Sequence, residues 1–179
     1  MTTQKIRLLG DSVLSSLSIK VTTFDKELRG LVKDLTETMV ATDAAGLSAP
    51  QIGVSSRVFV YRIGDTIGHV VNPRLHLSQE IQDGPEGCMS LPDLQFDVKR
   101  SMLVIAQGFN EYGEPVEIIG TQRLSRIIQH ETDHLDGILF IERLPPGERE
   151  RALAEVFKSQ WFNATLLNDG KPLIKISPH

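Results

Sequence analysis

The spacing of apolar residues along the chain predicts three helices, the first of them between residues 24 and 41. Five apolar side chains recur there at the three- and four-residue intervals of an amphipathic helix: Leu28, Leu31, Val32, Leu35 and Met39. Thr22 or Thr23 is the expected N-cap. Asp25 and Glu27 fall in the first turn, where a carboxylate is favourable. The sequence therefore predicts an N-terminal helix with one face in the core.

Short segments rich in β-branched and aromatic residues follow this helix and predict strands. They are "RVFVYR" at 57–62, "HVVNP" at 69–73, "LQFDVKR" at 94–100, "MLVIAQGF" at 102–109 and "PVEIIG" at 115–120. The turn-forming stretch "NEYGEP" lies between the last two segments and predicts that they form a hairpin.

The segment "TQRLSRIIQHETDHLDG" predicts a central helix, capped by Thr121 and ended by Gly137. Its apolar stripe is formed by Leu124, Ile127, Ile128 and Leu135. Glu131 falls inside this stripe, and His130 and His134 lie along its edge. The opposite face is expected to be wet and consists of Gln122, Ser125, Gln129, Asp133 and Asp136.

The segment "PPGERERALAEVFKSQWF" predicts a C-terminal helix. Four of its apolar residues share one side: Leu153, Val156, Phe157 and Trp161. We expect one catalytic domain over 1–163, including this helix at about 147–162, and a C-terminal tail over 164–179. The order of elements predicts an α+β fold, with antiparallel sheets packed around the central helix and a helix at each end.

The acid inside the apolar stripe of the central helix points to a metal. A carboxylate facing a core is costly unless a partner or a raised pKa compensates for its burial. In the pattern H-E-x-x-H, two imidazoles four residues apart bind one ion, and the glutamate takes a proton from metal-bound water. A catalytic ion of this kind needs three protein ligands and one open position. His130 and His134 therefore require a third ligand from elsewhere.

Several residues compete to be that third ligand. The metallopeptidase pattern with a third histidine fails, because Phe140 stands at the required position. Glu150 or Glu155 would serve if their helix folded back, but the setting "GERERALAE" is typical of a solvated, charged face. Cys88 is favoured, because a thiolate is a strong ligand and the flanking "GPEGCMSLPD" predicts a tight, polar loop.

Composition narrows the class of protein. The chain has 179 residues, of which 40% are hydrophobic, and this suits one globular domain with its own core. A net charge of −4 argues against a protein held to nucleic acid by bulk charge. The start "MTTQKIRLLGDS" lacks a signal-peptide hydrophobic region, so the expected location is the cytoplasm. With a single cysteine, an intrachain disulfide is excluded and the thiol is available for chemistry.

Three segments, "AAGLSAPQIGV", "EGCMSLPD" and "QHETDHLDG", closely resemble in order and separation the three signature motifs of bacterial peptide deformylases. The resemblance runs from about "IRLLGDSVL" through "ILFIERL", and "NEYGEP" and "SQWF" resemble deformylases of actinobacterial type. It implies removal of the formyl group from the N-terminal formylmethionine of nascent chains, with metal-bound hydroxide attacking the formamide carbonyl. It also implies one divalent ion on Cys88, His130 and His134, with Glu131 as the base. The implied metal in the cell is ferrous iron, and zinc, nickel or cobalt would be able to replace it.

The resemblance implies roles for further residues. The oxyanion donors would be the side-chain amide of Gln51 and the backbone N–H of Met89. The residues implied in substrate binding are Ala45, Gly46, Leu47 and Ile127. Gly46 and Leu47 would offer backbone hydrogen bonds, and the other two would line the methionine pocket. Glu86 is expected to tie its loop to Arg100 or Arg126.

The chain departs from the family pattern at three positions, and these bear on substrate range. Ala44 stands where glycine is usual, Ser48 where alanine is usual, and Met89 where leucine is more common.

The expected partners are N-formylmethionyl peptides and, transiently, the ribosome, docked through the helix at 147–162. No specificity for nucleic acid and no membrane contact are expected. Three alternatives stay open: a paralogue for another N-formyl substrate or an inhibitor-resistant copy, a metallopeptidase, and a metal-stabilised binding module without turnover.

Overall fold

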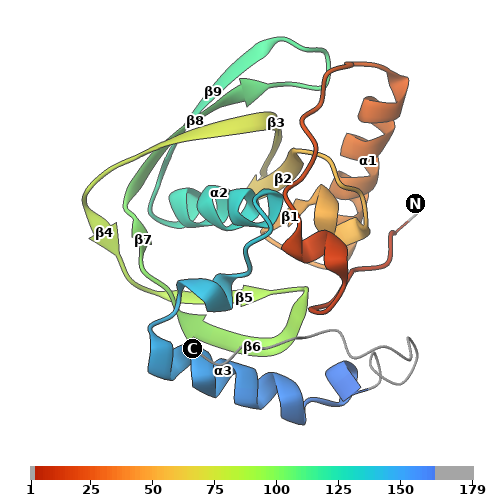
Figure 1. The fold of residues 1–179 in the computed structure, drawn as a ribbon. Helices are drawn as coiled ribbons and strands as arrows, with labels where there is room; N and C mark the ends of the chain where they lie inside the picture. The colour runs from red at the N-terminus through yellow and green to blue at the C-terminus, as the bar shows by residue number, and fades with distance from the viewer. Residues whose placement is uncertain (1–2, 164–179) are drawn as a thin grey trace.

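A buried helix, α2 (Gln122–Leu135), lies at the centre of the fold, and sheets and helices surround it (Figure 1). The computed structural model describes residues 3–163. One antiparallel sheet has the strand order β1-β2-β3-β8-β9. Its strands are β1 (Gly46–Ser48), β2 (Val58–Ile63), β3 (Thr66–Leu77), β8 (Leu103–Phe109) and β9 (Pro115–Thr121). The expected "NEYGEP" hairpin is confirmed, since β8 pairs with β9.

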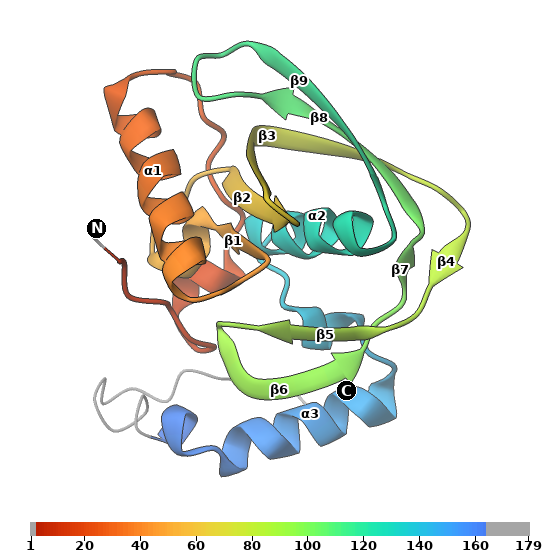
Figure 2. The same ribbon diagram turned by 180° about the vertical axis from the view of Figure 1, so that it is seen from behind.

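Strand β2 shows how alternating side chains build two cores. Val58 and Val60 pack with the apolar face of α1 (Lys26–Ala41), whereas Phe59 and Tyr61 pack with α2. Successive side chains of a strand point to opposite faces, so a run of apolar residues is expected where both faces are covered. This sheet is therefore held between two helices, and Figure 2 shows α1 and α2 on either side of β2.

Helix α1 begins later than the sequence indicated. Its N-cap is Asp25, whose carboxylate accepts hydrogen bonds from the backbone N–H groups of Glu27 and Leu28, both at 3.0 Å. The prediction of Thr22 or Thr23 as the cap is wrong. A carboxylate that reaches two N–H groups of the first turn satisfies donors that have no partner within the helix, and its charge suits the positive end of the helix dipole.

A second layer lies on the other side of α2. It contains the hairpin of β5 (Pro85–Cys88) and β6 (Leu91–Asp97), the short pair β4 (Ile81–Gln82) and β7 (Arg100–Ser101), and α3 (Pro146–Lys158). The segment "LQFDVKR" divides between β6 and β7, because the chain changes its pairing partner there from β5 to β4. Three 3-10 turns complete the described elements: η1 (Ser12–Ser15), η2 (Ala49–Ile52) and η3 (Phe140–Arg143).

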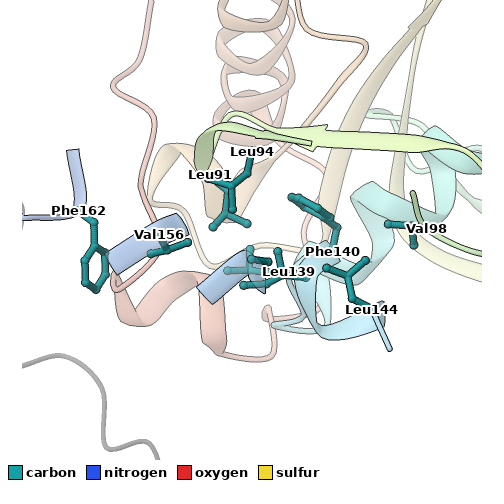
Figure 3. Packing of buried hydrophobic residues seen from close by; sticks show 10 residues of the cluster. Leu91, Leu94, Val98, Leu139, Phe140, Leu144, Val156 and Phe162 are labelled. Atoms are coloured by element: carbon teal, nitrogen blue, oxygen red, sulfur yellow. The ribbon is translucent and has the colours of Figure 1, made fainter. Parts of the chain in front are cut away.

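An apolar cluster joins the β5–β6 hairpin to α3 and η3 (Figure 3). Leu91 and Leu94 from β6 face Val156 of α3, with Phe140 of η3 beside them. The side chain of Phe157, expected on the buried side of this helix, is 42% exposed, so that placement is wrong. Helix α3 itself was correctly predicted, although it ends at Lys158 before an extended Ser159.

Three of the five residues on the polar face predicted for α2, Ser125, Gln129 and Asp133, are buried rather than wet. Gln129 exchanges two hydrogen bonds with the backbone of Ser101 in β7, at 3.0 and 3.1 Å, and the Ser125 hydroxyl donates to the same carbonyl at 2.8 Å. Asp133 is also buried, whereas Gln122 and Asp136 are exposed as predicted. The apolar stripe itself is confirmed, so α2 is enclosed on nearly every side.

The observed architecture confirms the α+β fold with antiparallel sheets packed around a central helix. The predicted tail at 164–179 lies outside the described residues. Within the described part of the chain, no helix has the length and apolar character needed to cross a membrane.

Candidate active site

Helix α2 and the end of β5 bring one sulfur and two imidazoles together. The Sγ atom of Cys88 lies 3.2 Å from Nε2 of His134. One ligand atom from each of Cys88, His130 and His134 lies within 4.8 Å of the other two. The histidines are four residues apart on one helix face, with ring centroids separated by 4.9 Å. Cys88 thus joins two histidines that lie 42 and 46 positions later in the sequence.

Cys88 is placed by an irregularity in the β5–β6 hairpin. It is the last residue of β5, and the pairing with β6 shifts register between Gly87 and Cys88. Such a shift re-aims a side chain relative to a regular strand. The residue was expected on a tight loop, and that expectation is wrong, since it ends a strand immediately before the tight turn to Leu91.

The three side chains fit a metal ion. Bonds of about 2.0–2.3 Å to a tetrahedral ion place its ligand atoms roughly 3.3–3.8 Å apart. The observed cluster needs only small adjustments to reach this spacing. Burial raises the pKa of the Cys88 thiol, but His134 and His130 outweigh that effect and hold the pKa well below its usual range. A thiolate, the form that binds metal, is therefore favoured.

Glu131 lies beside this cluster as a buried carboxyl group. Its Oε2 atom has no hydrogen-bond partner among the described residues. Burial raises the pKa of Glu131 to about 7, against the opposing charges of His130 and His134. The carboxyl group packs on Gly46 of β1, where a Cβ atom would overlap Oε1. A buried acid with an unused oxygen and a pKa near neutrality can take up and return a proton.

The side chain of Gln51, in η2, extends to the sulfur of this cluster. Its Oε1 atom accepts hydrogen bonds from Ser48, from the backbone N–H at 2.9 Å and from the hydroxyl at 3.0 Å. Its Nε2 atom lies 3.5 Å from Sγ of Cys88 and 3.4 Å from Oγ of Ser90. The backbone N–H of Ser90 also donates to Sγ of Cys88, at 3.4 Å. The thiolate therefore has two N–H donors beside it.

Glu86 holds the outer side of the site. Its carboxylate accepts from Arg100 at 2.7 and 2.9 Å and from Arg126 at 2.9 Å, so both predicted partners are present. Burial raises the pKa of Glu86, but Arg100 and His130 outweigh it and lower the pKa to about 2. Because Glu86 is ionised, Nδ1 of His130 at 3.0 Å must donate to it. Nε2 is therefore the nitrogen of His130 that can bind a metal.

Asp133 is a residue of this site that sequence reasoning placed on the wet face. Its carboxylate accepts from Arg100 at 2.6 Å and from Arg143 of η3 at 2.5 and 3.0 Å. Arg100 therefore bridges Asp133 and Glu86. The signal available in the sequence was its place inside the H-E-x-x-H segment, three residues after His130.

An open cavity of about 870 Å³ lies over these groups. Most of the residues predicted from the sequence line it: Ala45, Gly46, Gln51, Cys88, Met89, Ile127, His130 and Glu131. Leu47 and His134 do not line it: the side chain of Leu47 is fully buried against α1, and His134 is fully buried behind Cys88. Glu150 and Glu155 are exposed on α3, outside the cluster of metal-ligand atoms.

A cluster of one sulfur and two imidazoles, with a buried carboxyl group beside it, meets an open cavity through Cys88, His130 and Glu131. These groups define a class of site, that of metal-dependent hydrolases. The sequence pattern of the family described as polypeptide deformylase matches residues 3–150. The chain belongs to this family.

Relatives and solved structures agree with this assignment. The peptide deformylase of Acidothermus cellulolyticus is 52% identical over 179 residues, covering 100% of this chain and 96% of that protein. The peptide deformylase 1 of Corynebacterium glutamicum is 42% identical, covering 91% and 99%. The crystal structure of the Thermus thermophilus peptide deformylase matches with a TM-score of 0.83 at 36% identity, covering 93% of this chain and 96% of that one. Family membership confirms the activity that the three motifs predicted, metal-dependent peptide deformylation.

Proposed function

We propose that this enzyme deformylates N-formylmethionyl nascent peptides with one divalent ion held by Cys88, His130 and His134. The observation that carries the proposal is the 3.2 Å approach of Sγ of Cys88, which lines the cavity, to Nε2 of the buried His134. When bound, the ion would act as a Lewis acid that acidifies a water molecule and polarises the formamide carbonyl. Thiolate and imidazole ligands suit ferrous iron, which we propose as the metal in the cell, and also zinc, nickel or cobalt.

Glu131 is proposed as the general base and then the general acid. Its carboxyl group is buried, which raises its pKa, and one of its oxygens has no partner among the described residues, so it can accept a proton from the attacking water. The same proton then passes to the departing amine, which would otherwise leave as an unstable anion. Gly46 leaves room for the carboxyl group next to β1.

Gln51 and Met89 are proposed as the donors that stabilise the tetrahedral oxyanion. Both line the cavity, and Nε2 of Gln51 faces Cys88. Attack on the formamide carbon places negative charge on the former carbonyl oxygen, and fixed donors at that point lower the barrier. Removing one such donor typically slows an enzyme by about a hundred- to a thousandfold.

The substrate backbone is proposed to lie along β1. This strand forms an edge of its sheet, because β2 is its only partner among the described strands. An extended peptide can add to such an edge through main-chain hydrogen bonds, here with Gly46 and Leu47. Ala45 and Ile127 line the cavity and would contact the methionine side chain. Recognition through the backbone would tolerate many nascent sequences.

The proposed cellular location and the alternative function both follow from the substrate. We propose the cytoplasm and transient docking at the ribosome, where nascent chains emerge, with α3 as the docking helix. Relatives in Corynebacterium and Streptomyces carry the names peptide deformylase 1 and 2, and these names favour keeping a paralogous role as the alternative. Comparing formyl-Met peptides with other formamides separates the two roles.

The proposal is tested by purifying the enzyme without oxygen and measuring metal content and formate release on the same sample. We expect about one ion per chain and turnover of a formyl-Met tripeptide. Oxygen is excluded because a thiolate beside ferrous iron is readily oxidised. A metal-loaded sample that releases no formate from this peptide would contradict the proposed substrate.

A further inference from the structure

Ser48 occupies the junction between β1 and η2, one turn before Gln51. The residue is fully buried, and Gln51 is only 2% exposed. Both hydrogen-bond donors of Ser48, its backbone N–H and its hydroxyl, lie within 3.0 Å of Oε1 of Gln51. The glutamine side chain thus folds back onto the start of its own 3-10 turn, as in a capping box.

This contact decides which way the Gln51 amide points. A backbone N–H can only donate, so the amide atom 2.9 Å from the Ser48 nitrogen must be the oxygen. The NH₂ half of the same amide is then directed to the opposite side, toward Cys88 and Ser90. One side chain therefore caps a turn with its oxygen and presents its nitrogen to the active site.

We propose that Ser48 is a positioning residue, whose hydroxyl holds the side-chain amide of Gln51 in the orientation that points its NH₂ group to the active site. The inference rests on the proposed function, in which Gln51 donates to the oxyanion. With alanine at this position, Oε1 would keep the backbone donor and lose the hydroxyl. The second donor restricts rotation of the amide plane, and donation to the carbonyl oxygen strengthens the N–H groups on the other side through polarisation.

The expected consequence is specific to the transition state. A donor held where charge develops acts on the chemical step more than on substrate binding, so its loss lowers kcat more than it changes KM. Loss of one neutral hydrogen bond that only orients the donor corresponds to about a three- to tenfold change. Ser48 does not line the cavity, so substrate contacts are not altered directly.

The first test compares Ser48→Ala with Ser48→Thr, which keeps the hydroxyl, and with Ser18→Ala. Ser18 is a matched control, because it is a buried serine whose hydroxyl has no partner among the described residues. We expect kcat to fall about three- to tenfold in Ser48→Ala, with KM and metal content within about twofold of the wild type. Activity should be retained in the other two variants. An unchanged kcat in Ser48→Ala, or a change confined to KM, would overturn the inference.

A second test asks whether Ser48 acts through Gln51. In a Gln51→Ala background, Ser48→Ala should cause no further loss of kcat, and an equal loss in both backgrounds would overturn the inference. The side-chain amide of Gln51 gives a readout that needs no turnover. In ¹⁵N-labelled, zinc-loaded protein we expect its resonances to shift and its amide protons to exchange faster in Ser48→Ala, and unchanged resonances would also overturn the inference. A wild-type enzyme without formate release would contradict the proposed function, while this amide signal would still test Ser48.

Discussion

The Nδ1 atom of His130 lies 3.0 Å from Oε2 of Glu86, and this contact links the site to a buried charge network. Replacing Glu86 with Gln removes the carboxylate that Arg126 donates to, leaves Arg100 with Asp133 alone, and gives His130 a weaker acceptor. Breaking a buried ion pair costs about 3–5 kcal/mol of stability. Loss of the outer partner of a metal-binding histidine weakens metal binding about 10- to 100-fold. Denaturant unfolding and competition with a chelator measure the two effects, and metal affinity equal to the wild type would contradict the role given to Glu86.

A substitution at Gly46 tests whether this residue positions Glu131, the proposed base. A Cβ atom at this position would overlap the Glu131 carboxyl group, so Gly46→Ala should displace it. A misplacement of about 1 Å costs on the order of a hundredfold in rate, and we expect kcat to fall accordingly. Gly30→Ala in α1 is the control, because its Cβ meets nothing within 4 Å. It should retain full activity and gain about 0.5–1 kcal/mol of stability. Equal kcat in both variants would show that this contact does not position Glu131.

The raised pKa of Tyr61 predicts that the free energy of unfolding decreases at alkaline pH. Burial raises the pKa of its phenol above the ordinary tyrosine value of 10.0. In the unfolded chain the phenol ionises first, so between the unfolded and folded pKa values the folded protein binds more protons. The stabilising effect of the neutral, buried phenol is thus complete below about pH 10 and declines as pH rises toward the folded pKa.

The variant Tyr61→Phe should remove this part of the alkaline dependence. Denaturant unfolding of zinc-loaded protein between pH 8 and 11 measures it. We expect the two proteins to run in parallel up to about pH 10 and the wild type to fall more steeply above that value. Identical slopes throughout would show that Tyr61 ionises equally in the folded and unfolded chains.

The sequence predicted the parts of the fold that local spacing determines. The stripe that includes Ile127 and Ile128 follows from helical periodicity, and the two histidines follow from the spacing of four. The burial of Gln129 could not be predicted in this way, because it depends on hydrogen bonds to Ser101, 28 residues earlier in the chain. A polar residue that is buried by a distant backbone looks the same in sequence as one that faces water.

Strand β5 was missed for a different reason. Its residues, "PEGC", have low strand propensity, and the hairpin with β6 is the pairing that defines them as a strand. Cys88 was nonetheless identified as a ligand candidate, because its chemistry and the family motif do not depend on the type of element that carries it. The sequence thus grouped Cys88 with the two histidines, as the structure does, without predicting the strand that carries Cys88.

The central claim is that the sulfur of Cys88 and the imidazoles of His130 and His134 hold one ion, and the most direct measurement is the metal content of Cys88→Ser. The wild type, Glu150→Gln and Glu155→Gln should each contain about one ion per chain and release formate, since both glutamates are exposed on α3. Cys88→Ser should lose most of its metal and its activity while remaining folded, because a hydroxyl is a far weaker ligand than a thiolate. Full metal content in Cys88→Ser, together with metal loss in either glutamate variant, would contradict the account.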